Sequence, residues 1–343
     1  MKHRIPFLVI LCALVCFANA STAVCQQTRV YRGSIGGSHV QMQLNFDANK
    51  VSGSYFYDRI GEKLKLAGTI NAQGALELTE LGANNKPSAK IICKHKLGDD
   101  LVDSDCTWSR TDGTHQAFVT LTEQHSGFTG GLHLVPKTII ERARGISISY
   151  PQLASDKPLS SSATAFNQTV TTWINKTLKH VDPEPGPHTV YELNYNVLLG
   201  TNDLISFELS EYVDFGGAHP NNGYYAMTYD LVRNRELKIE DVLKADSDYK
   251  TAIAKFVVAD IQRRDDIIEQ QEAKSEGRQP RKQDEPIVSM DQLTEIWAFG
   301  ITPKGLMVYF NFPNVIAVFD RTFISYSTLK DYLKADSPTA RFQ

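Results

Sequence analysis

The chain has 343 residues, and its 36 Lys and Arg against 39 Asp and Glu give a formal net charge of −3. Such a mildly acidic chain lacks the excess of basic charge that phosphate backbones require, which argues against nucleic-acid binding and is compatible with a basic protein partner. The length exceeds one typical hydrophobic core, so we expect two domains.

The N-terminus has the layout of a cleavable signal peptide. Lys2 and Arg4 precede an apolar run of about 13 residues, and Ala18-Asn19-Ala20 follows as a small-x-small cleavage pattern. The run is shorter than the about 20 apolar residues of a membrane helix, and no later stretch approaches that length. We therefore expect a signal peptide over residues 1–20, a periplasmic or secreted location, and no transmembrane segment in the mature chain.

The cysteines indicate one disulfide. Cys12 and Cys16 leave with the signal peptide, and Cys93 and Cys106 flank a polar turn. In an oxidising compartment this spacing predicts a bond between Cys93 and Cys106 that closes a hairpin and contributes about 3 kcal/mol at best. Cys25 is then left over.

Cys25 lies just beyond the predicted cleavage site, which raises the question of a lipid anchor. A bacterial lipobox has Leu three residues before the cysteine and a small residue directly before it. Thr22 and Val24 occupy these positions here. We therefore do not expect a lipid anchor at Cys25.

The region over residues 28–136 is rich in strand patterns. Val40, Met42, Leu44 and Phe46 alternate with polar residues, which places four apolar side chains on one face of a strand. Further short runs follow between turn-forming residues, at Gly53–Tyr57, Leu64–Leu66, Gly68–Ile70, Leu76–Leu78, Phe118–Leu121 and Leu132–Leu134. Because no convincing helix separates these runs, we expect an all-β domain, either an antiparallel sandwich or a barrel.

The region over residues 146–335 mixes helical and strand periods. Apolar residues from Phe166 to Leu178 recur at intervals of three and four after the cap candidates Ser160–Ser162, which predicts an amphipathic helix. A second helix is expected from Tyr249 to Ile268, with the charged segment 269–286 as a solvated loop.

Strands of the same region are expected in pairs. Alternating residues at 191–199 and 205–209 around a turn predict a hairpin, followed by a third strand at 224–231. Two more strands, at 297–301 and 306–312, precede a short helix that Ser327 would cap. Sheet plus helices predict an α+β domain with a mainly antiparallel sheet and two main helices.

The common catalytic motifs are missing from the sequence. It contains no nucleophile elbow, phosphate loop or H-E-x-x-H zinc motif. Ser327-Thr328-Leu329-Lys330 matches the S-x-x-K of penicillin-recognising enzymes, but their S-D-N and K-T-G motifs are not present. The histidines have no metal-ligand spacing. We expect no catalytic residue, metal or cofactor, and an enzyme of unrecognised type remains an alternative.

The most unusual segment is the loop 214–223 between two predicted strands, which concentrates Gly, Pro and Asn. Its paired glycines could expose backbone amides to a partner. The expected binding residues are Asp214, Phe215, Gly216, Gly217, His219, Pro220, Asn221 and Tyr224. A purely structural loop is the alternative, and the nearby aromatic residues also leave open a carbohydrate-binding or peptidoglycan-binding module.

Several ordered sequence pieces carry a family resemblance. They are Ile148-Ser149-Tyr150-Pro151, the run Gly216–Asn221, Asp230 with Leu237–Val242, and Tyr326–Lys330. With these pieces, residues 146–334 resemble the extracellular domain family shared by the lysozyme-sensing anti-sigma factor RsiV and the peptidoglycan deacetylase PdaC. The N-terminal half, with its pieces 31–37 and 53–57, looks like an all-β module of exported bacterial proteins.

The resemblance implies an α+β fold and an exported binding protein of the bacterial envelope, with lysozyme or another cell-wall enzyme as the expected partner. It does not imply deacetylation, which in PdaC belongs to a separate catalytic domain. Two departures bear on partner specificity. Asn234-Arg235 replaces the family's Gly-Lys turn, and the segment 312–319 replaces a proline-tyrosine-rich stretch.

Overall fold

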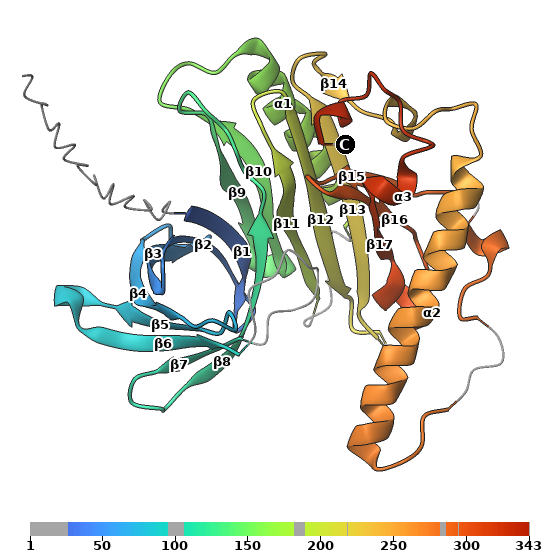
Figure 1. Cartoon of the computed structure of the whole chain (residues 1–343). Coiled ribbons are helices and arrows are strands. Elements are labelled where there is room, and N and C mark those ends of the chain that lie inside the picture. The colour runs from blue at the N-terminus through green and yellow to red at the C-terminus, as the bar shows by residue number, and fades with distance from the viewer. Residues whose placement is uncertain are drawn as a thin grey trace, which may run out of the picture.

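The computed structural model describes residues 27–94, 106–181, 189–217, 219–281, 286–293 and 295–342 (Figure 1). The expected signal peptide, Cys25 and the turn 96–100 lie outside these ranges. In Figure 1 an N-terminal barrel stands beside a broad sheet, and the long helix α2 lies at the opposite side of the molecule. Within the described ranges, no helix combines the length and the apolar composition needed to cross a membrane.

The N-terminal region is a closed antiparallel barrel, which confirms the predicted all-β domain and selects the barrel over the sandwich. The predicted alternation is visible in its core, because Val40, Met42 and Leu44 are fully buried. The eight strands are β1 (Gln27–Ile35), β2 (Ser38–Asp47), β3 (Lys50–Tyr57), β4 (Leu64–Ile70), β5 (Leu76–Leu81), β6 (Pro87–Cys93), β7 (Cys106–Arg110) and β8 (Gln116–Gln124).

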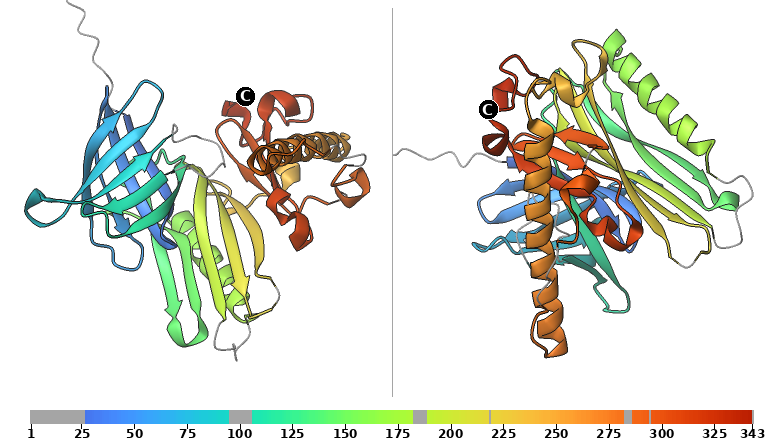
Figure 2. Two further views of the ribbon diagram at one scale, coloured as in Figure 1. Left: turned by 90° about the horizontal axis from the view of Figure 1, so that it is seen from below. Right: turned by 90° about the vertical axis from the view of Figure 1, so that its right-hand side faces the viewer.

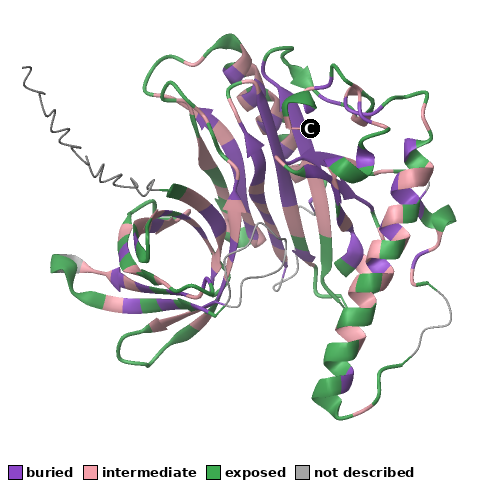
Figure 3. Ribbon diagram, viewed as in Figure 1, coloured by how far each residue is buried: buried purple, intermediate pink, exposed green. Residues whose placement is uncertain are grey.

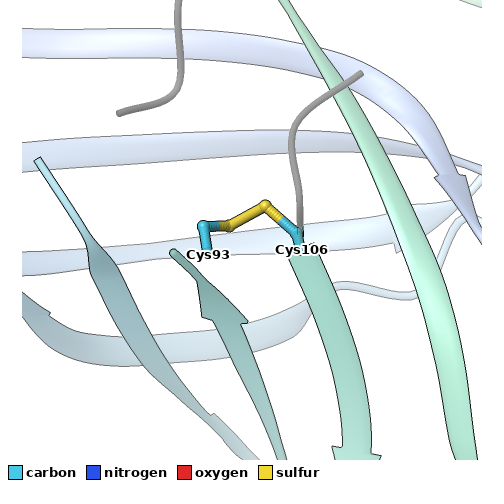
Figure 4. Close-up of a disulfide and its surroundings, with 2 residues drawn as sticks. All are labelled: Cys93 and Cys106. Carbon is cyan, nitrogen blue, oxygen red and sulfur yellow. A yellow bond between two sulfur atoms is a disulfide. The ribbon is translucent and has the colours of Figure 1, made fainter. Parts of the chain in front are cut away.

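The predicted disulfide is present between β6 and β7 (Figure 4). Cys93 and Cys106 face each other in the register of the two strands and are 13 residues apart in the sequence. Both cysteines are buried in the barrel core. The bond therefore fixes two neighbouring barrel strands at one end of the barrel.

A six-stranded sheet follows, in the order β14-β13-β12-β11-β10-β9. Only β10 and β11 pair in parallel, so the sheet is mainly antiparallel as predicted. The expected run Leu132–Leu134 contributes to β9, which pairs with β10. The strands are β9 (His133–Glu141), β10 (Ile146–Ala154), β11 (Val190–Gly200), β12 (Leu204–Asp214), β13 (Asn221–Asp230) and β14 (Arg235–Glu236).

Different elements cover the two faces of this sheet (Figure 2). Helix α1 (Ser161–Leu178) begins after Ser160, whose side chain accepts a hydrogen bond from Ala163 N, and it packs Phe166 and Val170 onto one face. The strands β15 (Ala298–Ile301), β16 (Gly305–Tyr309) and β17 (Arg321–Ser325) form a second sheet on the other face. Burial is concentrated where these layers meet, on β11 to β13 and β16 (Figure 3).

Helix α2 (Tyr249–Glu276) packs against the second sheet and is longer than predicted. The expected solvated loop from residue 269 was wrong for its first eight residues, which are helical. Glu269 accepts hydrogen bonds from Arg278, and Gly277 ends the helix in the left-handed conformation with φ 67°. The ion pair and the glycine therefore stabilise the C-terminal turns of α2, which the spacing of apolar residues in the sequence does not predict.

A second correction concerns helix α3 (Tyr326–Leu329). Its cap is Ser325, whose Oγ accepts a hydrogen bond from Thr328 N at 3.2 Å, whereas Ser327 lies inside the helix. Ser325 has the extended backbone conformation of a capping residue, because β17 ends there. Ser327 therefore does not have the capping role that its sequence position suggested.

Residues of the barrel fill a split in the six-stranded sheet. The parallel pairing of β10 with β11 covers only Ile146–Ile148 and Tyr191–Leu193, after which the two strands are no longer paired. Val197 N donates to the Gln124 side chain, and Gly200 N donates to His125 O at 2.6 Å. The end of β8 thus supplies the hydrogen-bond partners that β10 no longer offers.

Candidate functional site

The predicted binding loop connects β12 to β13 and lies at the surface. The two strands pair as far as Val213 and Asn221, so the chain between them forms a hairpin end. Asp214 Oδ1 accepts a hydrogen bond from Gly216 N at 2.8 Å, and Gly216 has φ 76°, so this position favours glycine. A Cβ atom added at Gly216 or Gly217 would meet no other atom within 4 Å.

The structure brings most of the predicted site residues together at this hairpin end. His219, Pro220 and Asn221 are exposed, and 52% of the surface of Phe215 is exposed. Phe215 is one of several large apolar side chains that this protein exposes. The loop therefore offers a partner one aromatic side chain among polar groups and open backbone.

Tyr224 lies apart from the other predicted residues. It follows on β13, where its ring centroid is 6.3 Å from that of Tyr309 and 4.6 Å from the guanidinium carbon of Arg321. These contacts place the ring between the two sheets. Tyr224 supports the hairpin from inside and is only partly accessible.

The 3-10 helix η5 (Asn314–Phe319) lies against β13 and extends the candidate surface. Its side chains Val315 and Val318 are 91% and 69% exposed. Arg321 follows η5, and its guanidinium lies over the ring of Tyr224. Tyr224 is three residues beyond Asn221, where the hairpin ends. We name Phe215, Val315 and Val318 the apolar rim. Our sequence reasoning missed the two valines as site residues, although it singled out the segment 312–319 as a departure from the family pattern.

A buried polar network fixes the surface from behind. Glu208 of β12 is fully buried and accepts hydrogen bonds from Tyr309 Oη at 2.8 Å, Arg321 Nη1 at 2.9 Å and Asn196 Nδ2 at 3.0 Å. Burial and the Glu208 carboxylate raise the pKa of Tyr309 well above its ordinary value. Because three donors from three strands hold the carboxylate, we interpret Glu208 as a structural anchor between β12 and the second sheet.

The described residues contain no group of three or more His, Cys, Asp or Glu side chains that could hold a metal ion.

Comparisons with known proteins match the C-terminal half. Residues 240–317 match the family model described as "Protein of unknown function (DUF3298)". The peptidoglycan-N-acetylmuramic acid deacetylase PdaC of Bacillus subtilis (strain 168) is 26% identical over 195 residues, which cover 55% of this chain and 38% of PdaC. The match therefore spans less than half the length of that relative.

Two solved structures also match. A member of the DUF3298 family from Bacteroides fragilis NCTC 9343 is 12% identical and has a TM-score of 0.35, covering 62% of this chain and 96% of its own. A DUF3298 family protein from Pseudomonas aeruginosa PAO1 is 15% identical with a TM-score of 0.38, covering 59% and 94%. The family match itself runs from η3 (Ile239–Asp241) through α2, η4 (Met290–Leu293), β15 and β16 into η5. The C-terminal region of the chain is thus similar to the DUF3298 family over residues 240–317.

Proposed function

We propose that the protein is an exported binding protein of the bacterial envelope that recognises a protein partner through the hairpin loop 214–221 and the apolar rim. The observation that carries this proposal is the exposure of Phe215 on the hairpin that leads into β13 and of Val315 and Val318 on η5, which contacts β13. Exposed apolar side chains with polar neighbours are typical of protein interaction sites.

The mild acidity of the chain and the likeness to PdaC, a protein named for its action on the cell wall, support an envelope partner. We take a basic lysozyme as the first partner to test, with another cell-wall enzyme as the next. Complementary charge would speed association, while the apolar rim would supply most of the affinity.

The test measures binding of the mature protein to immobilised lysozyme. Phe215→Ser should weaken binding at least tenfold, since truncating a central aromatic contact typically costs about 2 kcal/mol or more. Phe118→Ser is the matched control, because Phe118 is 55% exposed on the barrel, and it should bind like the wild type. Equal binding by all three proteins would contradict the assigned surface.

If lysozyme does not bind, affinity capture from an envelope extract decides the proposal. A protein retained by the wild type and by Phe118→Ser, but not by Phe215→Ser, would identify the partner. Identical sets of retained proteins would count against a binding role of this loop.

A further inference from the structure

An open cavity lies at the edge of the six-stranded sheet, beside β12 and β13. Its volume is about 180 Å³, below the about 300–1,000 Å³ of drug-sized ligand sites, so it suits a small ligand group. Its lining includes Trp173 of α1, Tyr225 of β13, Glu236 of β14, and Trp297 with Ala298. Elements from three parts of the C-terminal half therefore contribute side chains to one cavity.

The aromatic side chains of this cavity are held in place. The rings of Trp173 and Tyr225 are 5.1 Å apart at an interplanar angle of 67°, an edge-to-face contact that gives a firm wall. The indole of Trp297 is 55% exposed, although its backbone N–H is bonded to Tyr309 O at 2.9 Å. An exposed indole on a fixed backbone suits ligand contact better than packing.

The cavity also reaches an open position of the sheet edge. Leu237 N donates to Thr228 O, so the backbone groups of Thr228 point toward the outer edge of β13. By the two-residue period, the N–H and C=O of Ala226 point the same way. Among the described residues, no backbone pairing engages Ala226 on that edge, because β14 pairs only with Tyr229 and Asp230.

We propose that this cavity binds a saccharide unit that carries a 2-acetamido group. An acetamido group has one N–H and one C=O, which match the single open donor and acceptor of Ala226. The apolar C–H face of the sugar ring packs on Trp297, its methyl group packs against the Trp173–Tyr225 wall, and the Glu236 carboxylate accepts a hydrogen bond from a hydroxyl group. This inference does not depend on the apolar rim.

Other ligand classes use these groups less completely. A purely apolar ligand leaves the Ala226 amide and Glu236 without partners, which costs free energy. An extended peptide would pair with several alternate positions of β13, but the pairing of Thr228 with Leu237 closes the edge there. A quaternary ammonium ion uses the aromatic rings and Glu236 but has no acceptor for the Ala226 N–H.

The experiment titrates the mature protein with the N-acetylglucosamine trimer and follows tryptophan fluorescence and saturation transfer to the acetyl methyl. The glucosamine trimer and the glucose trimer serve as ligands without the acetamido group. We expect a Kd of about 0.1 to 1 mM for the acetylated trimer and at least tenfold weaker binding of the other two. The disaccharide of N-acetylglucosamine and N-acetylmuramic acid tests whether the ligand comes from the bacterial cell wall or from chitin. Tighter binding of this disaccharide than of the uncharged trimer assigns a cell-wall ligand. Weaker binding assigns a chitin-type ligand.

Trp297→Ala should weaken binding at least tenfold, and Phe118→Ala, which removes an equally exposed aromatic side chain from the barrel, should not change it. Both variants should keep the wild-type Tm, because neither side chain is buried. Saturating amounts of the trimer without any signal would overturn the proposal. So would equal binding of acetylated and non-acetylated trimers, binding that survives Trp297→Ala, or tighter binding of tetramethylammonium.

Discussion

Arg32 of the barrel donates a hydrogen bond from Nε to the backbone carbonyl of Tyr195 at 3.0 Å, and its guanidinium carbon lies 3.8 Å from the centre of the Tyr195 ring. The two residues are 163 positions apart in the sequence. Arg32 also forms an ion pair with Asp58 at 2.6 Å, and its side chain is only 1% exposed. The guanidinium therefore occupies the split where β10 and β11 no longer pair, and it joins the barrel to the larger sheet.

Replacing Arg32 should uncouple the two parts of the molecule. Arg32→Met leaves the buried Asp58 carboxylate without its cation, so we expect a loss of about 3–5 kcal/mol in the free energy of unfolding. Denaturation by urea, followed by near-UV circular dichroism, should change from one transition to two. Lys90→Met is the control, because its ion pair with Glu77 is about half exposed and should contribute less than about 1 kcal/mol.

Removing the disulfide should affect the barrel more than the rest. Cys93→Ser with Cys106→Ser frees the hairpin between β6 and β7, and we expect a loss of about 3 kcal/mol on the entropic account of cross-links. Hydrogen exchange should then accelerate on barrel strands while α1 and β12 keep their protection. Equal acceleration in both regions would show that the barrel and the large sheet unfold as one unit.

Local patterns were enough to predict most elements of the fold. The hairpin β11–β12 and helix α1 follow from side-chain periods of two and of three to four, and the disulfide follows from the spacing of two cysteines. The end of α2 could not be predicted in this way, because Arg278 stabilises it through Glu269. The Arg32 junction depends on groups that are distant in the sequence, and no local pattern indicates them.

The candidate site was predictable only in part. Its glycine-rich loop is evident in the sequence, whereas the inward position of Tyr224 depends on Arg321 and Tyr309 from other strands. The contributions of Val315 and Trp297 follow from the way the second sheet packs on the first. Both residues are apolar, so the sequence alone does not distinguish them from core residues. Only their exposure in the folded structure does.

His39 should make the protein less stable in acid. The pKa of His39 is lowered to about 4, first by burial and then by Arg32 and Arg59, while Asp58 opposes the shift. The unfolded chain, with a pKa of about 6.5, binds more protons between pH 6.5 and pH 4, so stability falls as the pH falls through this window, by up to about 3 kcal/mol.

A leucine at this position tests that dependence. Neither ring nitrogen of His39 has a hydrogen-bond partner, so His39→Leu should lose no such bond and should raise the stability at pH 4.5 relative to that at pH 7.5. The measurement is urea denaturation at pH 4.5 and pH 7.5. His180→Leu, at an exposed position after α1, is the control and should keep the wild-type dependence. An unchanged pH dependence in His39→Leu would assign the acid sensitivity to other groups.

Asp320 should act in the opposite direction over nearly the same pH range. Its burial raises the pKa to about 6, although Phe312 N donates to its Oδ1 at 3.0 Å and partly opposes the shift. The folded state therefore binds more protons than the unfolded state between about pH 4 and pH 6, and stability falls as the pH rises through this window. Asp320→Asn keeps the acceptor oxygen and removes the charge, so it should stabilise the protein by about 1–3 kcal/mol at pH 7.5 and have little effect at pH 3.5. Asp331→Asn, at an exposed position, should have little effect at either pH.

The Asp320 and His39 dependences have opposite signs and partly cancel in the wild type. The wild type should therefore show a flatter stability profile between pH 4 and pH 6 than His39→Leu or Asp320→Asn. A steeper wild-type profile would show that the two groups do not titrate as inferred.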